Sequence, residues 1–181
     1  MKQIQIRANI TGTGSYLPET ILTNEDIEKL VDTTDEWIQS RTGIRERRIA
    51  RPGETSSEMS TYAINNLMEN YQLTADEIDV IIVATITPDM MFPATAALVQ
   101  RNINAKNAWG YDLSAACSGF LFALQSGACL IASGLYKKVI VVGVDTMSSI
   151  LDFSDRNTCI LFGDGAGAVL LVECDTGVVE A

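Results

Sequence analysis

The sequence lacks histidine entirely and is poor in basic residues, with 13 Lys and Arg against 23 Asp and Glu and a formal net charge of −10. Binding to DNA or RNA requires a surplus of positive charge for the phosphates, so we expect no nucleic-acid partner. The four cysteines include no C-x-x-C pair. Without such a pair or a histidine, neither a zinc site nor a redox dithiol is indicated, and we expect no metal.

Long hydrophobic runs are also missing. The apolar runs at 80–86 and 139–144 are much too short to span a bilayer, and the N-terminus lacks the apolar stretch of a secretion signal. We therefore expect a cytoplasmic protein with no membrane partner and with free thiols. The 181 residues, 47% of them apolar, suffice for one substantial core, and no linker or repeat marks a domain boundary.

Patterns typical of helices and strands alternate along the chain. Strands are expected at 3–10, 79–86, 108–113, 137–145 and 165–173, with a glycine-rich turn at 11–18. Helices are expected after the caps Thr23 and Thr33, at 56–70, 93–103 and 118–133, with a short turn after Thr74. The later strands are apolar without alternation, as in strands covered on both faces. The class predicted is α/β, with a mostly parallel sheet between helix layers.

Cys117 lies just past the 108–113 strand, at the first turn of the next helix. A helix N-terminus stabilises a thiolate, the reactive form of cysteine. Small neighbours permit the sharp turn of a nucleophile elbow; they are Ser114, Ala115, Ala116, Ser118 and Gly119. The same residues fit tight strand-to-helix packing equally well, so both interpretations stay open on these residues alone. No histidine is available as the usual base for such a nucleophile.

The remaining cysteines and glycines indicate packing. Cys129, Cys159 and Cys174 fall in apolar stretches, so we expect them in the core. The alternating glycines of 163–167 lead into a strand and lack the G-x-G-x-x-G spacing of a dinucleotide loop. They predict close packing of layers and no phosphate site.

An arginine-rich segment at 35–51 stands out in an acidic chain, with arginines at 41, 45, 47, 48 and 51. Trp37 and Arg41 are four residues apart on one predicted helix face, where an indole and a guanidinium can hold a flat ring. An adenine nucleotide would satisfy both the ring site and the positive charge. Alternatively, the arginines pair with Glu36, Glu46 and Glu54 and Trp37 belongs to the core.

Three segments in order carry a resemblance to a known family: TGTGSYLPE with DEWIQSRTGIRER, DLSAACSGF, and DRNTCILFGDGAGA. Together they resemble the N-terminal half of β-ketoacyl-acyl carrier protein synthase III, a condensing enzyme of the thiolase superfamily. The resemblance implies that residues 1–181 form one N-terminal half of a thiolase-like layered αβαβα fold. That half would hold a five-stranded, mostly parallel mixed sheet with helices on both faces.

The resemblance also implies an activity. Cys117 would take an acetyl or other short acyl group from coenzyme A and pass it to the carbanion formed by decarboxylating malonyl-acyl carrier protein. The products would be 3-oxoacyl-acyl carrier protein and CO2, in the first condensation of type II fatty acid synthesis, with acyl-coenzyme A as substrate and no cofactor. Coenzyme A binding is implied for Thr33, Trp37, Arg41 and Arg156. Phe92 matches a residue that closes the partner's acyl pocket in a homodimer.

The chain departs from the family in one respect, because members are longer and carry a catalytic His and Asn in a C-terminal half that is absent here. We therefore expect a truncated, proteolysed or naturally split enzyme that cannot condense alone. Two alternatives remain: a non-catalytic dimerisation or interaction module, and another thiolase-fold enzyme such as 3-hydroxy-3-methylglutaryl-coenzyme A synthase or a secondary-metabolite condensing enzyme. Trp37 and Arg41, followed by RTGIRER, favour synthase III.

Overall fold

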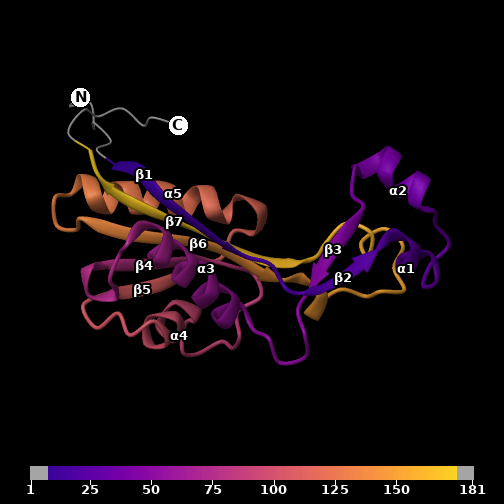
Figure 1. Cartoon of the computed structure of the whole chain (residues 1–181), viewed down its shortest axis with the longest axis horizontal. Helices are drawn as coiled ribbons and strands as arrows, with labels where there is room; N and C mark the ends of the chain where they lie inside the picture. The colour runs from indigo at the N-terminus through magenta and orange to yellow at the C-terminus, as the bar shows by residue number, and fades with distance from the viewer. Residues whose placement is uncertain (1–7, 175–181) are drawn as a thin grey trace.

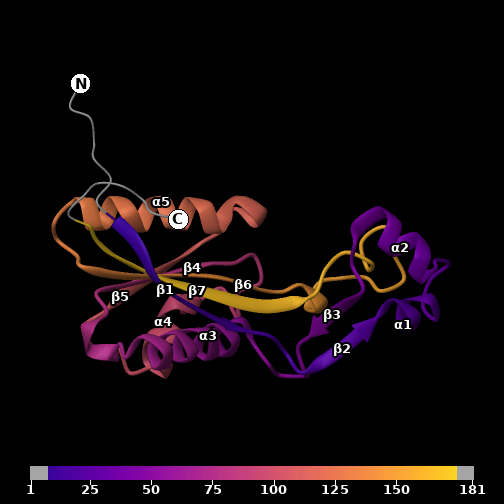
Figure 2. The same cartoon turned by 45° about the horizontal axis from the view of Figure 1, so that its top comes forward.

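In the computed structural model, which describes residues 8–174, a five-stranded sheet lies between two helix layers (Figures 1 and 2). Its strands are β1 (Ala8–Tyr16), β4 (Val80–Ala84), β5 (Trp109–Leu113), β6 (Lys138–Thr146) and β7 (Asp164–Glu173), in the order β1-β7-β6-β4-β5. Strands β5, β4 and β6 are parallel to one another, while β7 is antiparallel to both β6 and β1. Only β7 therefore runs opposite to the others, which confirms the mostly parallel mixed sheet.

Helix α5 (Gly119–Ala132) covers one face of the sheet, and α3 (Ser56–Tyr71) and α4 (Thr95–Asn102) cover the other (Figure 2). Strand β4 is buried on both sides: Ile81 and Val83 belong to the core beneath α3 and α4, and Val80 and Ile82 to the core beneath α5. Two-sided burial explains why this strand shows no apolar and polar alternation in the sequence.

A small lobe extends from one end of the sheet (Figure 1). It contains the antiparallel pair β2 (Thr20–Thr23) and β3 (Glu46–Ile49) and the helices α1 (Asn24–Glu28) and α2 (Asp35–Thr42). The chain between β6 and β7 enters this lobe, where Cys159 and Ile160 pack with Ile27 and Ile38 in a core of their own. The sequence analysis did not predict the β2–β3 pair.

Several predicted helix ends are confirmed, and one is shifted. Thr23 forms a complete capping box, and Gly43 ends α2 in the left-handed conformation at φ +75°. The cap of α2 is Thr34, whose Oγ1 accepts from Trp37 N at 3.1 Å, so the expected cap at Thr33 is wrong by one residue. Pro93 lies before α4, which begins at Thr95, and so is not in its first turn.

The glycine-rich turn expected at 11–18 is wrong, because β1 continues through Tyr16 in register with β7. The glycines serve contact with a helix instead: a Cβ at Gly14 would lie 2.3 Å from the backbone oxygen of Ala63 on α3. The earlier part of the strand predicted at 3–10 falls outside the described residues, except for 8–10.

Two of the three structural cysteines, Cys159 and Cys174, are buried as expected, but Cys129 is exposed. Its helix α5 carries apolar residues on its outer face as well as on its inner one, and Leu121 and Phe122 are also exposed there. An apolar neighbourhood in the sequence therefore did not imply burial. Within residues 8–174 no helix has the length and apolar character needed to cross a membrane.

Candidate active site

Cys117 is exposed at the point where the chain turns from β5 into α5. It lies in the 3₁₀ turn Ala116–Ser118, and the residue before it, Ala116, has φ +47°. Positive φ is uncommon for a residue with a side chain and costs of order 1 kcal/mol or more. The sharp turn predicted from the small residues is present, with the cysteine at its apex.

Cys117 opens into a cavity of about 330 Å³. The cavity is also lined by Phe120 of α5, by Gly143 and Asp145 of β6, and by Gly165 of β7. Residues 163–167 do lead into a strand and not into a phosphate loop, as predicted, since β7 begins at Asp164. Their contribution to the cavity wall was missed, because it depends on β7 lying beside β6.

The carboxylate of Asp145 fixes the loop that follows β4 at the rim of this cavity. Its Oδ1 accepts from Thr85 Oγ1 at 3.0 Å, from Ile86 N at 2.9 Å and from Thr87 Oγ1 at 3.0 Å. Three donors on one oxygen tie this loop to the end of β6. Nothing in the local sequence links Asp145 to these threonines, so sequence reasoning did not find it.

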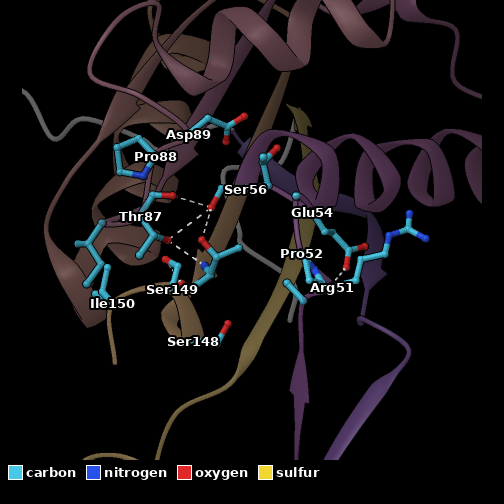
Figure 3. A pocket seen from close by; sticks show the side chains of 15 residues that line it. Arg51, Pro52, Glu54, Ser56, Thr87, Pro88, Asp89, Ser148, Ser149 and Ile150 are labelled. Carbon is cyan, nitrogen blue, oxygen red and sulfur yellow. Dashed lines mark hydrogen bonds between the residues drawn. The ribbon is translucent and has the colours of Figure 1, made fainter. Parts of the chain in front are cut away.

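A larger cavity of about 560 Å³ is lined by residues 148–150, which follow β6, by residues 86–89 and by residues 50–56 (Figure 3). Its polar groups are bonded to one another: Ser56 Oγ donates to Thr87 O at 2.7 Å, and Thr146 N donates to Thr87 Oγ1 at 2.8 Å. Asp89 accepts from the backbone N and Oγ of Ser57 at 2.9 and 2.6 Å. No cysteine lines this cavity, so the smaller cavity is the better candidate for the chemistry.

Asp164 connects the start of β7 to the loops of the larger cavity. This buried carboxylate accepts from Ala50 N at 2.7 Å, from Ser148 N at 2.8 Å and from Ser148 Oγ at 2.5 Å. Asp164 stands between Gly163 and Gly165, which line the Cys117 cavity. The same hydrogen bonds therefore set the position of this part of the cavity wall.

Two guanidinium groups lie over the indole of Trp37 on the surface of the small lobe. Arg41 Cζ lies 5.9 Å from the centroid of the indole, and Arg156 Cζ lies 4.5 Å from it. Arg41 is the neighbour predicted from helical spacing, whereas Arg156 comes from the distant segment between β6 and β7. The indole is 36% exposed, so the alternative that Trp37 belongs to the core is wrong.

Thr33 precedes α2 in the same lobe. Its Oγ1 is buried and has no hydrogen-bond partner among residues 8–174. A buried hydroxyl without a partner is costly and calls for an explanation. Thr34 has taken the capping role, which leaves the Thr33 hydroxyl without a partner among these residues.

The expected arginine cluster is smaller than the sequence suggests. Arg47 is buried, 4% exposed, and Arg48 pairs with Glu46 at 3.6 Å and donates to Pro18 O at 3.1 Å. The pairing of arginines with glutamates is therefore confirmed for Arg48. Three arginines remain exposed for an anionic ligand: Arg41, Arg45 and Arg51.

Phe92 lies in the segment between β4 and α4, away from the Cys117 cavity, whose lining does not include it. It is 86% exposed, and its neighbour Met91 is 98% exposed. Such exposure of two large apolar side chains is unusual for a surface that faces only water.

An exposed cysteine at the turn between a parallel strand and a helix that covers the sheet is the arrangement of a nucleophile elbow. The family model described as 3-oxoacyl-[acyl-carrier-protein] synthase III matches residues 111–180. β-Ketoacyl-[acyl-carrier-protein] synthase III of Chlorobaculum tepidum is 60% identical over 180 residues, 97% of this chain and 55% of that protein. That of Caldanaerobacter subterraneus is 51% identical over 173 residues, 96% of this chain and 52% of that protein.

Solved structures agree. The 3-oxoacyl-[acyl-carrier-protein] synthase III of Aquifex aeolicus superimposes with a TM-score of 0.90 at 50% identity, covering 93% of this chain and 54% of that one. The priming β-ketosynthase of the R1128 polyketide pathway gives 0.91 at 39% identity, covering 94% and 51%. The chain thus belongs to the β-ketoacyl-acyl carrier protein synthase III family. It spans about half the length of the curated relatives it matches.

Proposed function

We propose that this chain is the N-terminal, acyl-accepting half of a β-ketoacyl-acyl carrier protein synthase III. The observation that carries the proposal is the exposed Cys117 at the apex of the turn before α5, open to a 330 Å³ cavity. A thiol at a helix N-terminus is placed for nucleophilic attack, and the small cavity suits a short acyl chain.

The first half-reaction follows from this placement. The Cys117 thiolate attacks the thioester carbonyl of acetyl- or another short acyl-coenzyme A, forming a new sulfur–carbon bond. The bond from that carbon to the coenzyme A sulfur breaks, and coenzyme A leaves as a thiolate that takes up a proton. N–H groups at the start of α5 point toward the turn and can stabilise the oxyanion in between.

The second half-reaction transfers the acyl group to the carbanion left when malonyl-acyl carrier protein loses CO2, which gives 3-oxoacyl-acyl carrier protein and frees Cys117. This step needs donors that stabilise the carbanion. The sequence offers no histidine for it, and we propose that the family's His and Asn come from a second half, either on a longer chain or on a separate polypeptide. Condensation by this chain alone is therefore not expected.

Coenzyme A binding is proposed for the surface of the small lobe. The adenine would insert between Trp37 and Arg156, while Arg41 borders the ring and the Thr33 hydroxyl, which lacks a partner in the described chain, bonds to the nucleotide. The acyl-pantetheine arm would run from this lobe toward Cys117. We also propose a cytoplasmic homodimer in which Phe92, exposed here, closes the partner's acyl pocket.

The proposal is tested by incubating the chain with radiolabelled acetyl-coenzyme A, alone and together with a second half that contains His and Asn. Label retained after denaturation and located on Cys117 by peptide mapping supports it. Cys117→Ala should retain no label, and Cys129→Ala, which removes the other exposed thiol, should retain as much as the parent. The proposal fails if neither preparation is labelled, or if label is independent of Cys117.

A second candidate rests on the likeness to the R1128 priming β-ketosynthase, which matches as well in structure although less in sequence. Both candidates would use Cys117 in the same first half-reaction. They are named for different pathways, so the carrier protein that receives the acyl group would separate them. With a second half present, condensation with the carrier protein of fatty acid synthesis favours the first candidate, and condensation only with a polyketide carrier protein favours the second.

A further inference from the structure

Arg47 is a buried cation whose bonds go to neutral groups. Its side chain donates through Nη1 to Asn24 Oδ1, and through Nε at 3.2 Å and Nη2 to the carbonyl of Ile160. Burial lowers the pKa of the guanidinium, and no ion pair to Arg47 is found in the described part of the chain. A buried charge is costly compared with an apolar side chain of similar size, so stability alone is a weak reason for an arginine here.

Asn24 extends this connection to helix α2. Its Nδ2 donates to Asp35 Oδ1 at 2.7 Å and to Ile44 O at 2.8 Å. Asp35 is the first residue of α2, two positions before Trp37, and its carboxylate also accepts from Gln39 Nε2. The guanidinium is therefore linked through one amide to the turn that presents the indole.

Arg47 also bonds to the segment that contains Arg156. Ile160 lies four residues after Arg156, and its carbonyl receives two of the N–H groups of Arg47. A guanidinium donates in a rigid planar fork, so its bonds fix direction as well as distance. The two walls of the Trp37–Arg156 pair belong to segments far apart in the sequence, and Arg47 bonds directly or through Asn24 to both.

We infer that Arg47, acting with Asn24, is a positioning residue that sets the separation between α2 and the Arg156 segment for an adenine ring. The inference rests on the proposed function, since it concerns the same nucleotide site. A flat ring in contact with both walls needs them about 7–8 Å apart, whereas Arg156 Cζ now lies 4.5 Å from the indole centroid. The Arg156 side chain must withdraw by about 3 Å, and it can return onto the ring only if its backbone stays fixed.

The inference is tested by coenzyme A titration followed by Trp37 fluorescence, in a Trp109→Phe background where Trp37 is the remaining indole. Arg47→Met removes the bonds to Asn24 and to the carbonyl of Ile160. Asp35→Ala leaves Arg47 in place and removes the carboxylate on α2 to which Asn24 donates. We expect each to weaken coenzyme A binding, the first by about ten-fold. Binding of pantetheine, which has no adenine, and the rate of Cys117 alkylation by iodoacetamide should not change.

Two neighbouring residues provide matched controls. Arg48→Met removes the same charge from the next position of β3, where the side chain bonds to Glu46 and Pro18. Glu36→Ala removes the same charge as Asp35→Ala from the same turn of α2. Both controls should bind coenzyme A within about two-fold of the parent, as expected for surface charges.

The outcomes are distinct. Equal coenzyme A affinity in Arg47→Met and Arg48→Met, with far-UV circular dichroism like that of the parent, overturns the positioning role. If Arg47→Met does not fold, the comparison of Asp35→Ala with Glu36→Ala decides in the same way. A parent chain that does not bind coenzyme A overturns the proposed nucleotide site and this inference together. A parent that binds while all four variants bind equally overturns the inference alone.

Discussion

Replacing Asp164 by Asn should destabilise the protein although the two side chains have the same shape. The two carboxylate oxygens accept from two different backbone N–H groups, those of Ser148 at 2.8 Å and Ala50 at 2.7 Å. An amide has one oxygen, so in either orientation one of these N–H groups faces an NH2 group. A buried donor left without an acceptor costs about 1–3 kcal/mol. We expect a net loss of about 2 kcal/mol, because burying a neutral amide is less costly than burying a charge.

Urea denaturation at pH 7, followed by far-UV circular dichroism, measures this loss. With a slope of about 2 kcal/mol per molar urea, the midpoint of Asp164→Asn should fall by about 1 M. Asp152→Asn is the control, since this exposed carboxylate bonds only to Ser154 among the described residues. Its midpoint should shift by less than about 0.3 M. Equal midpoints for the two variants would refute the argument that Asp164 joins the loops around the cavities.

Two further predictions concern packing and pH. Gly14→Ala should lower the free energy of unfolding by about 3 kcal/mol, because the added Cβ would meet the backbone of α3 at Ala63. Gly167→Ala is the control and should not lower it, because no atom lies within 4 Å of the added Cβ. Equal urea midpoints for the two variants would contradict this. The pKa of Glu77 is lowered from 4.5 to about 2, chiefly by the hydrogen bond from Lys138. The contribution of the ionised Glu77 to the free energy of unfolding is therefore present above pH 4.5 and is lost as the pH falls toward 2. In urea melts between these pH values, Glu77→Gln should lose less stability than the parent. Parallel curves of stability against pH for the two proteins would contradict this.

The sequence predicted the layers of the fold where its local patterns matched the final environment. The apolar runs became the buried strands β4 and β6. The side chain of Thr23 caps the start of α1, and the left-handed backbone of Gly43 ends α2. The β2–β3 pair was missed because each strand has only four residues and no strong apolar alternation. The turn expected at 11–18 was wrong because pairing with β7 and contact with α3 outweigh the flexibility of its glycines.

The candidate site was predictable in part. Helical spacing placed Arg41 beside Trp37, and the small residues before α5 indicated the turn at Cys117, but their catalytic and binding roles remain predictions. Arg156 entered through a family resemblance, since no local pattern connects it to Trp37. Arg47 was grouped with the surface arginines because charge in a sequence does not show burial, which depends here on Asn24 and on a carbonyl from another part of the chain.

The stacking of Arg156 on Trp37 would make the proposed binding of a nucleotide at this surface an exchange of partners. In the described structure the indole face is already occupied by a guanidinium at 4.5 Å. In the proposed complex an adenine between Trp37 and Arg156 would replace this one contact by two, each worth about 0.5–2 kcal/mol, so the net gain from stacking is about that of a single contact. So small a gain favours quick release of the nucleotide in the function proposed above.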